Sequence, residues 1–199
     1  MDNSCRRADI SGRDAYSRII SVFLVLFTTL VISCAASFIA FGMAESVVGN
    51  ASFVFFPTSF VPFSIFESLR NAVPELIFII ALFFTAFSLF SEACGVIIAL
   101  IRGISLGCVL RLTISGTLSL SSPSAGIAFY LVSTMVLLVF AAYSSVYSRA
   151  LLSLKSDCGR SEYDGYFGCI AAEYLRLTLA LGGCAIIPAV LSRILFRMK

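Results

Sequence analysis

The sequence has no histidine among its 199 residues. This absence excludes histidine-ligated zinc, haem held by histidine, and every Ser-His or Cys-His nucleophile pair. Intramembrane proteolysis would need a serine with a histidine, paired aspartates at membrane depth, or a motif such as H-E-x-x-H, and the sequence has none of them. A glycine-rich phosphate loop is also absent. We therefore predict a protein that is not an enzyme and holds no metal or cofactor.

Charged residues are scarce as well, at 13% of the chain, whereas 59% of the residues are hydrophobic and the mean hydropathy is +1.01. A water-soluble fold could not bury so much apolar surface. The apolar residues fall into blocks long enough to cross a hydrocarbon layer of roughly 30 Å, which needs about 20 helical residues. The sequence thus predicts an all-α fold, a polytopic transmembrane helical bundle surrounded by membrane lipid.

The net charge and the cysteine spacing indicate which partners and cross-links to expect. The net charge is only +3 and the basic residues gather at the ends of the apolar blocks, which gives little support to nucleic-acid binding. The seven cysteines form no C-x-x-C pair, and five lie inside apolar blocks, where cysteine behaves as a small hydrophobe. We predict no nucleic-acid partner and no disulfide framework.

About five crossings are predicted, after a polar, arginine-bearing cytoplasmic tail at residues 1–18. Together they form a single transmembrane domain at 19–199. The boundary between the second and third blocks stays open: either the second crossing ends near Glu92, or one long helix reaches Arg102 and the next starts at Gly103. The blocks are residues 19–43, 75–90, 93–120, 127–147 and 169–194.

Three connections join these blocks. Residues 44–74 are rich in phenylalanine and form a long external loop, whose second half is either a short interfacial helix from Pro62 or a segment packed on the bundle. Residues 121–126 form a turn, and residues 148–168 a charged cytoplasmic loop.

The distribution of basic residues indicates the orientation. With the N-terminus inside, the tail, Arg102 and the 148–168 loop place eight basic residues in the cytoplasm against four outside. Three of those four stand at the C-terminus, so an even number of crossings, or a kinked return at Pro188, stays open. The predicted location is a cell membrane, which the chain crosses several times.

Charged residues at membrane depth cost roughly 2.5 to 3.5 kcal/mol each on insertion scales, so they need partners. Glu173 and Arg176 stand three apart on one helix face, and we expect them to pair and to anchor the helix near the cytoplasmic interface. A transport or signalling role is the alternative. Glu92 and Arg102 are expected near block ends, which leaves Arg111 as the deepest charge.

The third block contains a small-xxx-small step, Gly103 to Gly107, which lets helix backbones approach closely. Arg111 and Ser115 continue the stripe at four-residue spacing. We predict that the stripe is a helix–helix interface, within the protomer or between chains of a homo-oligomer, and that Arg111 meets an acid such as Glu173 across it.

The run from Val96 to Gly107 resembles the signature of the stage II sporulation protein M family, in which a basic residue, a glycine and a second glycine follow an apolar helix. The order of elements is similar over most of residues 71–196, while residues 1–70 match in layout only. The basic stretch from Arg149 to Lys155 and the closing Ile187-Pro188 belong to this similarity.

The resemblance implies a location in a bacterial cytoplasmic or septal membrane. It also implies a non-enzymatic membrane scaffold in the sporulation engulfment complex, which recruits or positions peptidoglycan-degrading partners. Cell-wall hydrolases are then the expected partner proteins. The alternative is a small transporter or channel subunit whose intramembrane Arg and Glu residues line a polar path.

Overall fold

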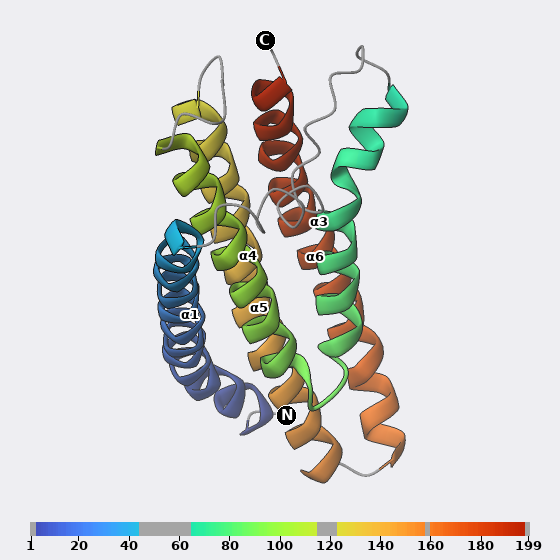
Figure 1. Ribbon diagram of the computed structural model, residues 1–199. Coiled ribbons are helices and arrows are strands. Elements are labelled where there is room, and N and C mark those ends of the chain that lie inside the picture. The colour runs from blue at the N-terminus through green and yellow to red at the C-terminus, as the bar shows by residue number, and fades with distance from the viewer. Residues whose placement is uncertain (1–2, 44–64, 115–122, 158–159, 198–199) are drawn as a thin grey trace.

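The computed structural model describes residues 3–43, 65–114, 123–157 and 160–197, and these residues form five helices and no strand (Figure 1). The all-α fold predicted from composition is confirmed. The helices are α1 (Asn3–Met43), α3 (Ile65–Thr85), α4 (Ser91–Ile114), α5 (Pro123–Asp157) and α6 (Arg160–Arg197).

Four helices contain segments long and apolar enough to cross a membrane, and α3 contributes a shorter apolar segment, Glu75–Thr85. Helices suit this solvent because each one satisfies its own backbone hydrogen bonds, which lipid cannot do. The arrangement is that of a multi-pass membrane protein. The four long segments are Tyr16–Ala40, Ser91–Arg111, Ile127–Ser153 and Ile170–Pro188.

Consecutive helices run antiparallel, so α1, α4 and α6 rise from the end where the chain begins, and α3 and α5 return to it (Figure 1). Helix α1 packs against α4 and α5, while α3 packs against α6, α5 and α4. Helices α4 and α5 therefore form the centre of the bundle. The start of α1 and the end of α6 lie at opposite ends of the bundle (Figure 1).

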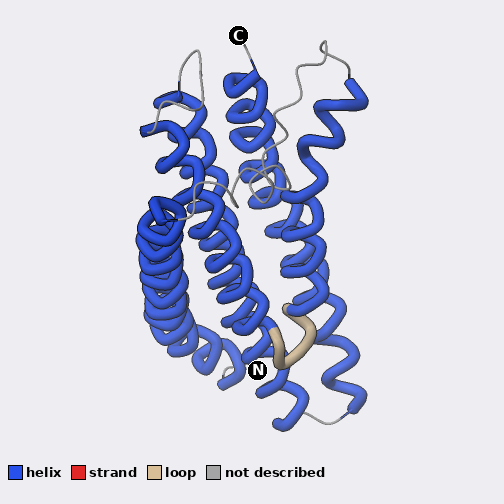
Figure 2. Tube along the Cα trace, in the orientation of Figure 1, coloured by secondary structure: helices blue, strands red, loops and turns tan. Residues whose placement is uncertain are grey.

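A tight turn separates α3 from α4 and decides between the two boundaries left open above (Figure 2). The Ser88 amide donates to the Thr85 carbonyl at 2.9 Å, the Phe90 amide donates to Ser88 Oγ at 3.2 Å, and Ser148 Oγ donates to the Ser88 carbonyl. The second block thus ends close to Glu92. Helix α4 runs through Arg102 without a break, and placing Arg102 in the cytoplasm was wrong.

Helix also replaces much of the predicted loop structure. Helix α5 continues to Asp157 and α6 begins at Arg160, so the 148–168 segment is mostly two helix ends. The predicted turn at 121–126 already belongs to α5 from Pro123 onward, since proline is well tolerated in a first turn. Helix α1 begins at Asn3, inside the polar tail.

Proline 188 lies inside α6, which continues to Arg197, so the chain does not reverse there. The predicted external loop splits in two. Residues 65–74 are the first half of α3 rather than a separate interfacial helix, and residues 44–64 lie outside the described residues.

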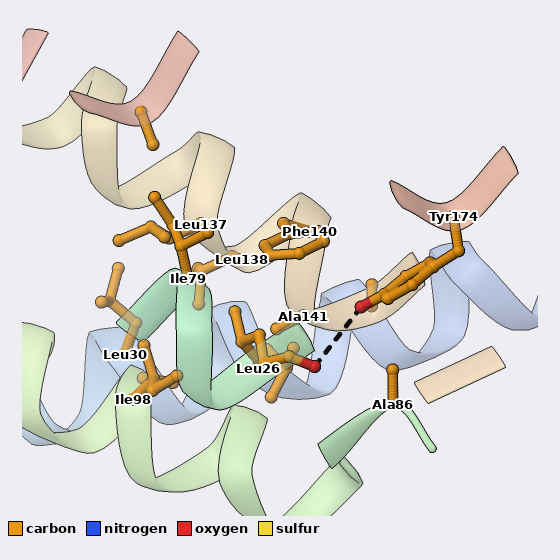
Figure 3. Close-up of a cluster of buried hydrophobic side chains, with 14 residues drawn as sticks. Leu26, Leu30, Ile79, Ala86, Ile98, Leu137, Leu138, Phe140, Ala141 and Tyr174 are labelled. Carbon is orange, nitrogen blue, oxygen red and sulfur yellow. Dashed lines mark hydrogen bonds between the residues drawn. The ribbon is translucent and has the colours of Figure 1, made fainter. Parts of the chain in front are cut away.

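All five helices contribute to one buried core (Figure 3). Leu26 and Leu30 of α1 meet Ile98 of α4 and Leu138 of α5 there, and Tyr174 of α6 closes the cluster with its hydroxyl toward the backbone of α3. Because lipid is as apolar as a leucine side chain, this core is held by close van der Waals packing rather than by the hydrophobic effect.

Three buried hydroxyl groups on α5 donate hydrogen bonds within their own helix. Thr134, Ser144 and Ser145 each donate to the carbonyl four residues earlier, at 2.8, 2.8 and 3.0 Å. Such back-bonding lets small polar side chains lie in a lipid-surrounded bundle without an orphaned donor.

Candidate functional site

A buried ion pair joins α3 to α4. The Arg102 guanidinium donates through Nη2 to Glu75 Oε1 at 2.7 Å, and the two side chains are 3% and 1% exposed. At 1.5 Å per residue, Arg102 lies about 16 Å above the start of α4 and Glu75 about 15 Å above the end of α3. The pair is therefore near the middle of a hydrocarbon layer of roughly 30 Å.

Two aromatic rings complete the surroundings of the Arg102 charge. The guanidinium carbon lies 5.0 Å from the ring centroid of Phe78 on α3 and 5.1 Å from that of Tyr130 on α5. A cation over a ring face in a desolvated site gains about 2 kcal/mol or more. Arg102 is thus held by three helices at once, with one counter-charge and two rings taking the place of water.

Gly103 and Gly107 of α4 pack against α1 of the same chain. A Cβ atom on Gly103 would lie 2.5 Å from the Leu30 carbonyl oxygen and still closer to Ser33 Oγ, and one on Gly107 would meet Ser37 and the backbone of α1 in the same way. Separations under 3.0 Å are not found for real Cβ atoms. Ser33 and Ser37 repeat the four-residue step, so small residues from both helices form the seam.

The other predicted members of this stripe behave differently. Arg111 lies over the Phe38 ring of α1, with the guanidinium carbon 5.6 Å from the centroid. It does not pair with Glu173, because Arg111 lies in the last turn of α4 and Glu173 in the first half of α6, toward opposite ends of the bundle (Figure 1). The predicted Arg111–Glu173 contact was wrong. The prediction that Arg111 is the deepest charge was also wrong, because Arg111 ends the apolar span of α4 and Arg102 lies near its middle. Ser115 lies outside the described residues.

The remaining predicted charges lie at the surface. Glu92 forms an exposed ion pair with Arg149 of α5 at the end of the bundle where α4 begins. Glu173 and Arg176 are both exposed, and among the described residues they form no ion pair with each other or with another group. The expected Glu173–Arg176 anchor within the helix is not formed.

Sequence reasoning missed Glu75, Phe78, Tyr130 and Tyr174. Glu75 had been taken only as the first residue of an apolar block, although an acid within an apolar helix is itself a sign of a buried partner. Tyr174 is 1% exposed, with its hydroxyl 2.6 Å from Ser144 Oγ and donating to the Leu82 carbonyl at 3.3 Å. Its ring stacks 4.5 Å from that of Tyr147, and no periodic pattern predicted this cluster.

These contacts join the helices of the bundle to one another. Among the described residues, no group of three or more Cys, Asp or Glu side chains is placed to hold a metal ion. No family model, curated protein or solved structure matches this chain. The resemblance to the sporulation family therefore still rests on the Val96–Gly107 run and the order of elements alone.

Proposed function

We propose that this chain is a non-enzymatic integral membrane scaffold. The observation that carries the proposal is that a charge near mid-depth is paired inside the chain: Arg102 is bound to Glu75 and covered by Phe78 and Tyr130. A charge neutralised and covered within the chain fixes three helices relative to one another. A rigid membrane body of this kind is suited to holding partner proteins in place.

The resemblance supplies the cellular setting of the proposal. In that setting the scaffold belongs to the sporulation engulfment complex and positions peptidoglycan-degrading partners at the septal membrane. The partners perform the chemistry. The sequence supports this through the Arg102-Gly103-xxx-Gly107 run, whose glycines form the α1–α4 seam.

An affinity purification from sporulating cells of the source tests the proposal. The tagged chain is solubilised gently and its companions are identified by mass spectrometry, beside a matched variant in which residues 51–60 become a Gly/Ser linker of equal length. We expect cell-wall hydrolases with the original chain and their loss with the variant. Recovery of the chain with no hydrolase would overturn the engulfment role.

A transporter or channel subunit is the second candidate, and one observation favours it: the ion pair lies near mid-depth, where ionisable residues commonly belong to substrate or proton paths. Purified protein in liposomes with pH- and ion-sensitive dyes tests it. Flux that Glu75→Gln abolishes and Glu92→Gln leaves intact would establish transport and replace the scaffold proposal.

A further inference from the structure

Helix α6 carries two charged side chains toward its outer surface. Glu173 and Arg176 are exposed, and Arg176 lies six residues inside the apolar span that begins at Ile170, a rise of about 9 Å. Neither forms an ion pair or a hydrogen bond with another described residue. Charged residues at membrane depth normally face the protein interior, and the described part of the chain gives these two charges no ion-pair partner.

The residues around Arg176 suit close approach by another helix. With 3.6 residues per turn, Ala172, Ala180, Gly183 and Ile187 fall with Arg176 in a sector roughly 80° wide on α6, and Glu173 lies at its edge. A Cβ atom on Gly183 would have nothing within 4 Å. Glycine weakens a helix relative to alanine, and the described chain gives this glycine no packing role. A second helix against this face would give it one.

The two charges are complementary to their own copies. Copies of one chain share the same orientation in a membrane, so two α6 helices meet in parallel about a two-fold axis along the membrane normal. Arg176 lies three positions after Glu173, about 4.5 Å along the axis. Helical side chains lean toward the N-terminus, which brings the Arg176 guanidinium toward the level of Glu173 on the opposite helix.

We propose that α6 forms a parallel dimer with a second copy of this chain, in which Glu173 of each copy pairs with Arg176 of the other. Because the dimer is two-fold symmetric, it contains this ion pair twice. The small residues Ala172, Ala180 and Gly183 allow the backbones to approach, and Ile187 packs at the far end of the contact. Within the described part of one copy neither charge forms an ion pair, and the dimer supplies a partner for both.

Charge exchange between two differently tagged chains tests this pairing. Glu173→Arg and Arg176→Glu are expressed alone and together, and dimers are measured in liposomes by energy transfer between labelled chains and by co-purification of the two tags. We expect each single variant to self-associate at least about tenfold more weakly than the original chain, because like charges then face one another. Co-expression restores a heterodimer, since one copy supplies two arginines and the other two glutamates.

The exposed Glu92–Arg149 pair provides the matched control, because Glu92→Arg changes a surface charge at the end of the bundle and away from this face of α6. That variant should dimerise as the original chain does. Gly183→Leu should weaken the dimer while leaving helical content and detergent stability unchanged. A monomeric original chain in the bilayer, with the charges reaching lipid headgroups instead, would overturn the proposal, and so would single charge variants that still dimerise fully.

Discussion

Glu75→Gln leaves the Arg102 guanidinium buried without a counter-charge. Removing one partner of a buried ion pair costs about 3 to 5 kcal/mol, whereas replacing both by apolar groups of similar volume is often neutral. We therefore expect Glu75→Gln and Arg102→Gln each to lose about that much stability. The double variant Glu75→Leu/Arg102→Met should recover most of it. Unfolding in mixed detergent micelles measures all three.

The surface pair Glu92–Arg149 gives the comparison for that experiment. Both side chains are about half exposed, so water screens the interaction and Glu92→Gln should cost about 1 kcal/mol or less. If the double variant at residues 75 and 102 lost the sum of the two single losses, the residues would contribute independently. The assignment of the pair as the lock between α3 and α4 would then be wrong.

Substitutions of Tyr174 test the contribution of a second buried polar group, the Tyr174 hydroxyl. Its hydroxyl contacts Ser144 Oγ and the Leu82 carbonyl, so Tyr174→Phe should cost about 0.5 to 1.5 kcal/mol while the ring still fills its site. Tyr174→Ala also removes the ring stacked on Tyr147 and should cost about 3 to 5 kcal/mol. Equal losses for the two variants, in the same unfolding assay, would mean that the ring contributes nothing to packing.

At the scale of helices, the α1–α4 seam depends on the absence of two side chains. Gly103→Ala and Gly107→Ala place a Cβ atom within 3.0 Å of the α1 backbone, so the helices must move apart. We expect each variant to lose about 1 to 3 kcal/mol, as overpacked cores do. Gly168→Ala is the matched control, since a Cβ atom there has nothing within 4 Å and should stabilise α6 by up to about 1 kcal/mol. Similar effects at all three glycines would contradict the seam.

The sequence predicted helices well and contacts between them poorly, for a physical reason. Lipid demands long apolar segments, and these are visible in composition; it does not demand a particular neighbour for each helix. The pairing of Arg102 with Glu75 depends on where α3 turns into α4. Ser88 and Leu89 lie midway between the two residues along the chain, so a turn placed there brings both to one depth. Because apolar residues lie on both sides of this turn, the sequence pattern did not predict where it would be.

At the scale of the whole molecule, α1 and α6 run the same way, so the end of α1 that carries the arginines and the end of α6 at Arg197 lie at opposite ends of the bundle (Figure 1). We therefore expect these two ends on opposite sides of the membrane. With Arg102 now inside α4 and Arg111 at its far end, the count of basic residues becomes seven against five, which still favours an N-terminus in the cytoplasm. The C-terminus is then expected outside.

Reporter fusions that are active only outside the cytoplasm check this orientation. A fusion after Arg197 should be active and one before Asn3 inactive. Replacing Arg6, Arg7 and Arg13 by serine reduces the excess of basic residues on the cytoplasmic side. We expect a mixture of chains in the two orientations, in which a share of the C-terminal fusions becomes inactive. Replacing Arg193 and Arg197 by serine, the matched change at the other end, should leave the orientation uniform because it strengthens the same asymmetry. Inactive fusions at both ends of the original chain would mean that one of the helices, most directly α3 with its short apolar segment, does not cross.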